Sequence, residues 1–320
     1  MKTGKRYFEA QAPAPRTRRR FFARAAKLNS LAAILGLAAF LLGVACISAS
    51  LAEEVIAVLS SASGAYAESL AGFEKEWGRS VQAVNMTSER VPLSRSNNII
   101  IAFGAKAAMR QYPDRSTLIY WAPGLGVDQL DREGPAIKIW LGARPDILVA
   151  RLKEIQPQLK NLGIFYVSAY YTRYIENMRR AARPFGITIH ADKLDGTDNL
   201  PDRLRAMETK LEAVLMLNDP LFVNVQTFMI LKNYSWANGV PLYAPTAGLV
   251  EQGATASIGP TFTELGRAAA QTARKALTGD PAGEEIYPEV NEISVNLTAA
   301  SKTGVVFSEG FLKKVRRVFP

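Results

Sequence analysis

The sequence predicts an α/β protein built on parallel sheets, and two observations predict this class. Short apolar runs without alternation, such as 98–103 (NIIIAF) and 213–217 (AVLML), are typical of strands buried on both faces. Segments with the apolar spacing of amphipathic helices separate these runs, which indicates strands alternating with covering helices. A distinct N-terminal segment precedes this part of the chain.

Residues 1–52 carry most of the excess positive charge. They hold 9 of the 39 Lys and Arg residues and one acidic residue, Glu9, which leaves 30 basic against 28 acidic residues elsewhere. A basic stretch up to Lys27, an apolar run over 31–47 and small residues before a cleavage point after Ala52 follow the order of a secretory signal peptide. We therefore expect a nearly neutral periplasmic protein that binds no nucleic acid.

Three features leave the export route and the fate of this leader open. Residues 17–23 (TRRRFFA) resemble the bacterial twin-arginine export motif. The apolar run is also about the minimum length that spans a bilayer, so a retained membrane anchor is the alternative to cleavage. Cys46, the only cysteine, lies in this run and is either a small apolar residue or a lipidation site. Contact with a membrane is expected only through this leader, uncleaved or lipidated at Cys46.

The exported part alternates strands with helices. The expected strands are 54–60, 80–84, 98–103, 117–121, 136–140, 163–167, 186–190, 213–217 and 240–243. The expected helices are 66–77, 105–111, 145–159, 172–182, 200–211 and 219–238, the first because apolar residues recur in it at spacings of four and three. In parallel sheets ligands bind at the carboxyl ends of the strands.

Polar residues gather at these strand ends and form the candidate ligand site. Those of the first half are Ser60, Ser61, Ser63, Gly104, Ala105 and Lys106, and those of the second half are Ser168, Asp219 and Thr246. The serines and the helix N-terminus behind them suit a carboxylate, Lys106 offers an anion contact, and Asp219 suits an ammonium group. For each residue alone, capping of a helix is the competing interpretation.

Aromatic residues stand beside the same loops and can stack on a flat or apolar ligand. They are Tyr66, Trp121, Tyr170, Tyr171 and Phe222. Core packing is the alternative for Tyr66 and Phe222, whereas Tyr170 and Tyr171 are expected at the mouth of a cleft.

The sequence favours a non-enzymatic protein without a cofactor or metal. His190 is the only histidine, and its place in an alternating strand predicts a half-exposed structural residue. No set of His and Cys residues can build a zinc site, and no Ser-His-Asp arrangement can be argued beyond that one histidine. The GxSxG, Walker A and GxGxxG motifs are also absent from the sequence.

An ordered series of short motifs runs through the second half. These are VPLYA (240–244), VEQGA (250–254), ELGRAA (264–269), ALTGDP (276–281), VNLTAA (295–300) and TGV (303–305). FGAKAA (103–108) and LNDP (217–220) fit the same pattern. By their order and spacing, residues from about Val55 to the C-terminus resemble the substrate-binding components of a poorly characterised group of bacterial ABC transporters, which have the type I periplasmic-binding-protein fold.

The resemblance implies two α/β lobes with doubly wound parallel sheets, joined by crossover hinge strands, with ligand in the cleft. Lobe 1 is expected over 53–143 plus 261–285, and lobe 2 over 144–258 plus 293–320, with 253–259 and 290–297 as crossing strands. The implied partners are a small-molecule ligand and an inner-membrane permease with its ATPase.

The sequence departs from the family pattern in two places. Only 85–96 separates the second strand from the strand at 98–103, which is too short for an ordinary crossover helix. We therefore expect a shortened first lobe, with one sheet face bare or covered by a partner. Ala105 stands where many relatives carry Ser or Thr, so one hydroxyl that can hold an anion is missing.

The expected function is the periplasmic solute-binding component of an ABC transporter. It would capture an amino-acid-like metabolite or another small organic acid between the lobes, which close over it. The alternative is an envelope sensor or interaction protein that keeps the fold but has lost transport, and the shortened first lobe is the feature that favours it.

Overall fold

The computed structural model of the chain describes residues 55–87, 98–207, 210–279, 283–289 and 292–320. All of them belong to the unit Glu53–Pro320. The expected leader, with Cys46 and the twin-arginine stretch, lies outside the described residues. Among the helices of the described part, none is both long and apolar enough to cross a membrane.

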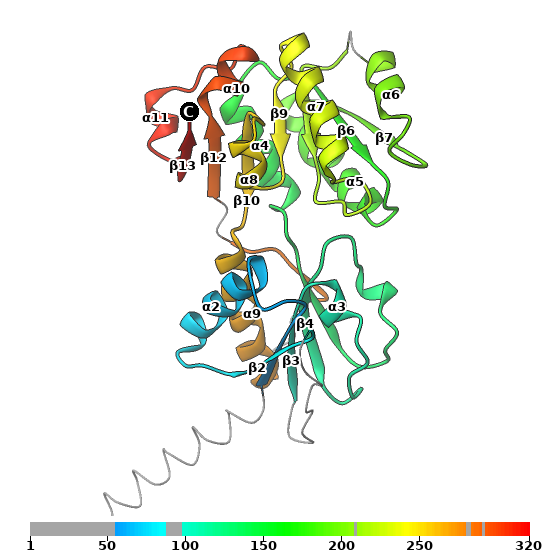
Figure 1. Cartoon of the computed structure of the whole chain (residues 1–320), viewed down its shortest axis with the longest axis vertical. Helices are drawn as coiled ribbons and strands as arrows, with labels where there is room; N and C mark the ends of the chain where they lie inside the picture. The colour runs from blue at the N-terminus through cyan, green and yellow to red at the C-terminus, as the bar shows by residue number, and fades with distance from the viewer. Residues whose placement is uncertain (1–54, 88–97, 208–209, 280–282, 290–291) are drawn as a thin grey trace, which may run out of the picture. The chain divides into compact units, whose positions relative to one another are not determined.

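The described residues form two separate sheets, each packed between helices (Figure 1). The first, which we call lobe 1 together with its helices, has six strands in the order β11-β5-β4-β3-β1-β2, all parallel to their neighbours. Its strands are β1 (Val55–Leu59), β2 (Gln82–Asn85), β3 (Ile99–Phe103), β4 (Thr117–Trp121), β5 (Ala136–Ile139) and β11 (Glu285–Ile286), and its helices are α2 (Ala65–Trp77), α3 (Ala105–Ala108), the 3-10 helix η1 (Val127–Gln129) and α9 (Phe262–Leu277).

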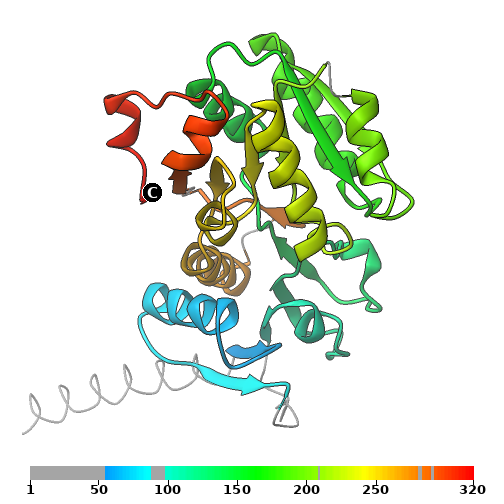
Figure 2. The same ribbon diagram turned by 45° about the horizontal axis from the view of Figure 1, so that its top comes forward.

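Helices α2 and α9 pack against each other over one face of this sheet, although 195 residues separate Glu68 from its hydrogen-bond partner Thr263 (Figure 1, Figure 2). Glycines allow the backbones of these two helices to approach closely. A Cβ atom on Gly266 would lie 1.9 Å from the carbonyl oxygen of Ser69, and one on Gly72 would lie 2.2 Å from that of Thr263. The backbones of the two helices therefore touch where the glycines stand.

The other face of the lobe 1 sheet is buried, so the expectation of a bare face is wrong. Ile56, Val58 and Ile100 on this face are fully buried in a cluster with Tyr112 and Tyr120. The link between β2 and β3 is as short as expected, and its residues 88–97 lie outside the described part. This face of the sheet is therefore buried although the link is short.

The second sheet, which with its helices we call lobe 2, has seven strands in the order β13-β12-β10-β9-β8-β6-β7. Its strands are β6 (Asn161–Tyr166), β7 (Thr188–Lys193), β8 (Ala213–Met216), β9 (Leu242–Ala244), β10 (Ala256–Gly259), β12 (Glu292–Asn296) and β13 (Arg317–Phe319). Its helices are α4 (Pro145–Ile155), α5 (Tyr171–Ala182), η2 (Arg183–Phe185), α6 (Leu200–Met207), α7 (Val225–Asn238), α8 (Ala247–Glu251), α10 (Leu297–Lys302) and α11 (Glu309–Leu312).

The chain passes between the two sheets three times: between β5 and α4, between β10 and α9, and between β11 and β12. The expected crossing strands at 253–259 and 290–297 correspond to β10 and β12, which belong to the lobe 2 sheet and flank two of these crossings. Strand β12 re-enters lobe 2 from lobe 1, so it runs antiparallel to β10, which leads out of lobe 2. The remaining pairs of this sheet are parallel.

Four expected helices are shorter than the sequence indicated, namely α3, α4, α6 and α7, and local chemistry explains the bounds of α7 and α4. Helix α7 begins at Val225 rather than at Asp219, because Asn224 caps it: Asn224 Oδ1 accepts from Thr227 N at 2.9 Å, and Thr227 Oγ1 accepts from Asn224 N at 3.2 Å. Helix α4 ends at Ile155, two residues before Pro157, because the proline ring disfavours helical geometry at the residue before it, Gln156.

Candidate functional site

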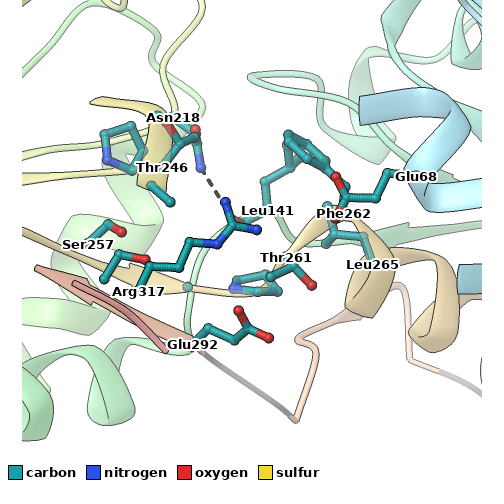
Figure 3. A pocket seen from close by; sticks show the side chains of 16 residues that line it. Glu68, Leu141, Asn218, Thr246, Ser257, Thr261, Phe262, Leu265, Glu292 and Arg317 are labelled. Atoms are coloured by element: carbon teal, nitrogen blue, oxygen red, sulfur yellow. Dashed lines mark hydrogen bonds between the residues drawn. The ribbon is translucent and has the colours of Figure 1, made fainter. Parts of the chain in front are cut away.

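A pocket of about 170 Å³ lies beside the crossings, between residues of both lobes (Figure 3). Lobe 1 contributes Glu68 from α2 and Phe262 from α9, and lobe 2 contributes side chains from strands and loops. Its full lining is Glu68, Leu141, Asn218, Pro245, Thr246, Ala247, Gly248, Ser257, Gly259, Pro260, Thr261, Phe262, Leu265, Glu292, Ser294 and Arg317. We call this the crossover pocket.

Three adjacent strands of lobe 2 form a polar wall of the crossover pocket. Ser257 of β10 is opposite Ser294 of β12, and Ser294 is opposite Arg317 of β13. Residues paired across neighbouring strands project to the same face of a sheet, so two hydroxyls and a guanidinium lie in one row. Figure 3 shows the Arg317 guanidinium reaching across the pocket toward Asn218.

The opposite wall, from lobe 1, is acidic and apolar. Glu68 accepts a hydrogen bond from Thr263 Oγ1 at 3.1 Å, which fixes its carboxylate at the pocket edge. Phe262 and Leu265 provide apolar surface beside it. Asn218 Nδ2 donates to the carbonyl oxygen of Leu141 at 3.3 Å and so ties a loop of lobe 2 to the first crossing. The pocket thus presents the Glu68 carboxylate from lobe 1 and the Arg317 guanidinium from lobe 2, where Glu292 also lines it and lies 3.3 Å from Arg316.

The candidate residues at the lobe 1 strand ends lie close together but make internal contacts. Ser60 Oγ accepts from Ala107 N at 3.0 Å and so caps α3, which is the competing interpretation for this serine. Gly104 has a φ of 96° and lies against Ser60 and Tyr66, where a Cβ atom would come within 2.6 Å of Ser60 Oγ. Ala105 is half-buried and Lys106 is exposed, and the Oγ atoms of Ser61 and Ser63 lie 3.5 Å apart at the surface.

The aromatic candidates of lobe 1 form a stacked column that leads to the crossover pocket. The rings of Tyr66 and Trp121 are parallel, with centroids 5.4 Å apart, and Trp121 lies 5.6 Å from Phe262. Trp121 is buried, and its Nε1 donates to Ser69 Oγ at 3.1 Å. The column reaches the pocket through Phe262, a residue that the sequence did not single out.

Asp219 is fully buried, and its carboxylate is surrounded by donors of the chain itself. Its Oδ2 accepts from the backbone N–H groups of Val167 and Ser168 at 2.7 and 2.8 Å, and its Oδ1 accepts from Ser168 Oγ and Leu221 N at 2.5 and 3.1 Å. These bonds join the loop after β6 to the loop after β8. Ligation of an ammonium group by Asp219 stays a prediction, and the geometry gives this carboxylate a structural role.

The other candidates of lobe 2 divide between core and pocket. Phe222 is fully buried in the lobe 2 core, which is the alternative that the sequence left open for it. Tyr171 is buried rather than at a cleft mouth, and its hydroxyl donates to the carbonyl oxygen of Asn218 at 2.6 Å. Thr246 precedes α8 and is the one sequence-predicted site residue that lines the crossover pocket.

A second hollow of about 620 Å³ also lies between residues of the two lobes. Trp140, Tyr170 and Tyr174 form its aromatic wall, and its charged residues are Asp128, Arg173, Glu176, Glu284 and Glu285. Beneath the wall lies Lys138, which is 1% exposed. Burial lowers the pKa of Lys138 to about 7, although the nearby carboxylates of Glu285 and Asp128 act to raise it. The acidic rim makes this hollow unsuitable for an anion.

Within the described ranges, no group of three or more His, Cys, Asp and Glu residues is arranged to hold a metal ion. His190 is half-buried on β7, and its Nε2 lies 2.9 Å from Asn161 Oδ1 on the neighbouring strand.

Sequence reasoning missed most of the crossover pocket, chiefly Glu68, Phe262, Glu292 and Arg317. Arg317 comes from a three-residue strand, which is too short to show periodicity. Asn218 was the one residue with a usable signal, because it directly follows the buried run 213–217, yet its neighbour Asp219 was preferred for its charge.

Comparison with known proteins agrees with this architecture. A ligand-free, open substrate-binding protein with adhesive properties from Clostridium difficile superposes with a TM-score of 0.62 at 16% identity, over 83% of this chain and 99% of that one. A domain from Streptococcus pneumonia in complex with L-Trp gives 0.58 at 16% identity over 83% and 99%, and a conserved domain protein from Vibrio cholerae gives 0.58 at 14% over 82% and 98%. At these identities the likeness shows the fold, which is that of type I periplasmic binding proteins.

The sequence comparisons point the same way. An uncharacterized protein of Rickettsia prowazekii is 21% identical over 179 residues, which are 55% of this chain and 58% of that relative. The chain thus aligns with a little over half of the length of this curated relative. Residues 147–319, more than half of the chain, match the family described as ABC transporter substrate binding protein. The chain belongs to the ABC transporter substrate-binding protein family.

Proposed function

We propose that this protein is the periplasmic solute-binding component of an ABC transporter and captures an amino-acid-like metabolite or another small organic acid in the crossover pocket. The observation that carries the proposal is the presence of opposite charges in the pocket lining, Arg317 from lobe 2 and Glu68 from lobe 1. A guanidinium binds a carboxylate through two parallel hydrogen bonds, and a carboxylate accepts from an ammonium group. A small zwitterion can therefore bind with its carboxylate to Arg317 of lobe 2 and with its ammonium group to Glu68 of lobe 1.

The size and lining of the pocket support a small ligand. A volume of about 170 Å³ corresponds to roughly six water molecules at ~30 Å³ each. The hydroxyls of Thr246, Ser257 and Thr261 line it beside the apolar side chains of Phe262 and Leu265. Contacts from both lobes and from the crossings mean that ligand binding and the lobe arrangement are linked, which is what a transporter needs in order to distinguish loaded from empty protein.

Export and partners follow from the leader and the family. A leader with the order of a signal peptide would place the protein in the periplasm, and the family implies a membrane permease with its ATPase as partners. Cleavage after Ala52, export by the twin-arginine route and lipidation of Cys46 are proposals that mass spectrometry of the protein recovered from the periplasm tests.

Arg317→Gln is expected to weaken carboxylate binding at least tenfold, because a hydrogen-bonded charge is lost from the pocket, at about 1.5–3 kcal/mol. Thermal shift against the twenty L-amino acids, L-Trp included, and short mono- and dicarboxylic acids identifies the ligand, and calorimetry measures its affinity. Arg205→Gln is the matched control, because Arg205 lies exposed on α6 and pairs with Asp202. Stabilisation by no compound of the panel, or unchanged affinity in Arg317→Gln, would refute the proposal.

Glu68→Gln separates the two ligand classes. If the ligand carries an amino group, this change is expected to weaken its binding about tenfold, because a charged acceptor becomes neutral, while binding of the matching acid without the amino group stays the same. Calorimetry with each pair of compounds, for example L-alanine and propionate, checks this. Equal losses for both members of the pair would remove Glu68 from the role of amino-group partner.

A further inference from the structure

Tyr170 is an aromatic residue of lobe 2 whose ring lies against lobe 1. It directly precedes α5, and its ring stacks on Trp140 at the end of β5, with centroids 5.0 Å apart. On lobe 1, Gly126 leaves room for the ring: a Cβ atom at this position would come within 3.2 Å of Tyr170 Cδ2. The ring therefore occupies a notch formed by Gly126, Trp140 and Lys138.

Lys138 forms the floor of this notch. Its Nζ lies 3.7 Å from the centre of the Tyr170 ring and 5.1 Å from that of Trp140, and it donates a hydrogen bond to the carbonyl oxygen of Leu125. In the described part of the chain, no carboxylate lies within ion-pair distance of this Nζ, since Glu285 pairs instead with Arg173 of α5 at 2.7 Å. The face of the Tyr170 ring thus covers a buried amine that has no acid partner.

The ring, not the hydroxyl, makes the contact. Among the described residues the Tyr170 hydroxyl has no hydrogen-bond partner, although it is buried. The neighbouring ion pair between Arg173 and Glu285 also links the lobes, but the Arg173 side chain is 72% exposed, so water and salt screen it. Aromatic contacts are therefore better shielded from water than this ion pair: Tyr170 packs on Trp140 and Lys138, and Tyr174 of α5 also stacks on Trp140, with centroids 5.1 Å apart.

We propose that the Tyr170 ring anchors lobe 2 on lobe 1 in this arrangement of the lobes. A second contact acts with it, because the loop after β4 also approaches Pro220: a Cβ atom on Gly124 would lie 2.6 Å from Pro220 Cδ. If the proposed function holds, this positioning residue also raises the affinity of the crossover pocket, since apparent affinity scales with the fraction of molecules already in the binding-competent arrangement.

Spin labels on Gln111→Cys in lobe 1 and Gln226→Cys in lobe 2 report the lobe separation by double electron–electron resonance. Both positions are exposed, and Cys46→Ala in the full chain leaves the labels as the only cysteine positions. Without added ligand, Tyr170→Ala is expected to shift the distance distribution and to raise the widely separated population about tenfold. Tyr170→Phe keeps the ring and is expected to match the unsubstituted protein.

Phe185→Ala controls for general loosening, because Phe185 is an exposed aromatic residue of the same lobe, in η2 after α5. Circular dichroism checks that each variant is folded. An unchanged distance distribution in folded Tyr170→Ala would overturn the proposal, and so would an equal shift in Tyr170→Phe. Neither result depends on a ligand, so failure of the anchor and failure of the proposed function are separate outcomes.

Discussion

Replacing Asp219 with alanine is expected to lower the free energy of unfolding by about 3–4 kcal/mol. The change removes one carboxylate that accepts four hydrogen bonds, and it leaves the backbone N–H groups of Val167, Ser168 and Leu221 in the interior without an acceptor. Because these bonds join the loops after β6 and β8, their loss loosens the edge of lobe 2 that faces lobe 1. Urea denaturation followed by circular dichroism measures the effect.

Asp202→Ala is the matched control for Asp219→Ala. Asp202 lies exposed on α6 and forms an ion pair with Arg205 in which both side chains are 72% exposed, so its removal is expected to change stability by no more than ~0.5 kcal/mol. The opposite pattern for Asp219→Ala, with normal stability and lost ligand binding, would show that the carboxylate faces a ligand instead of holding two loops together.

The sequence was sufficient for most of the lobe architecture, because burial on both faces leaves a direct trace in composition. The runs that become β3 and β8 are uniformly apolar, and both strands are buried throughout. Strand β11 and strand β13 left no such trace, since two or three residues at a sheet edge need no apolar pattern. The path of the chain between the lobes could not be predicted from local sequence patterns either, because it depends on contacts between distant segments.

The candidate site was harder to predict, because polar residues at strand ends serve structure and function alike. Ser60 and Asp219 were chosen for chemistry that suits a ligand, and both have hydrogen-bond partners within the chain. Sequence cannot distinguish these roles, since a serine that caps a helix and a serine that binds an anion occupy the same position along the chain. Arg317 is the opposite case: it lines the pocket, but no sequence pattern was a reason to choose it. It reaches the pocket only because β13 pairs with β12.

Tyr170 illustrates how lobe packing overrides a local expectation. An aromatic residue after a strand of an open sheet is expected to be accessible at the cleft, yet its ring lies on Lys138 and Trp140. That placement requires a glycine at position 126 and a buried lysine that forms no ion pair with a described carboxylate, neither of which carries a recognisable pattern. The burial and contacts of residues between the lobes are therefore the hardest to predict from the sequence of one lobe.

Replacing Gly266 with alanine is expected to destabilise the protein by about 3 kcal/mol, against the ordinary preference of helices for alanine. The new Cβ atom would lie 1.9 Å from the carbonyl oxygen of Ser69 and 2.7 Å from the backbone nitrogen of Phe73, both in α2. Backbone atoms cannot move aside as a flexible side chain can, so α2 and α9 must separate. Their separation opens the lobe 1 core around Phe73 and Leu265.

Gly310→Ala in α11 provides the matched control, because a Cβ atom there meets nothing within 4 Å. It is expected to leave stability unchanged or to raise it by up to about 1 kcal/mol, through helix propensity alone. Thermal unfolding of the two variants beside the unsubstituted protein therefore compares the same chemical change in a crowded and in an open helix. A Gly266→Ala protein as stable as Gly310→Ala would mean that α2 and α9 tolerate a wider spacing, and that the close glycine contact does not determine how this face of lobe 1 is packed.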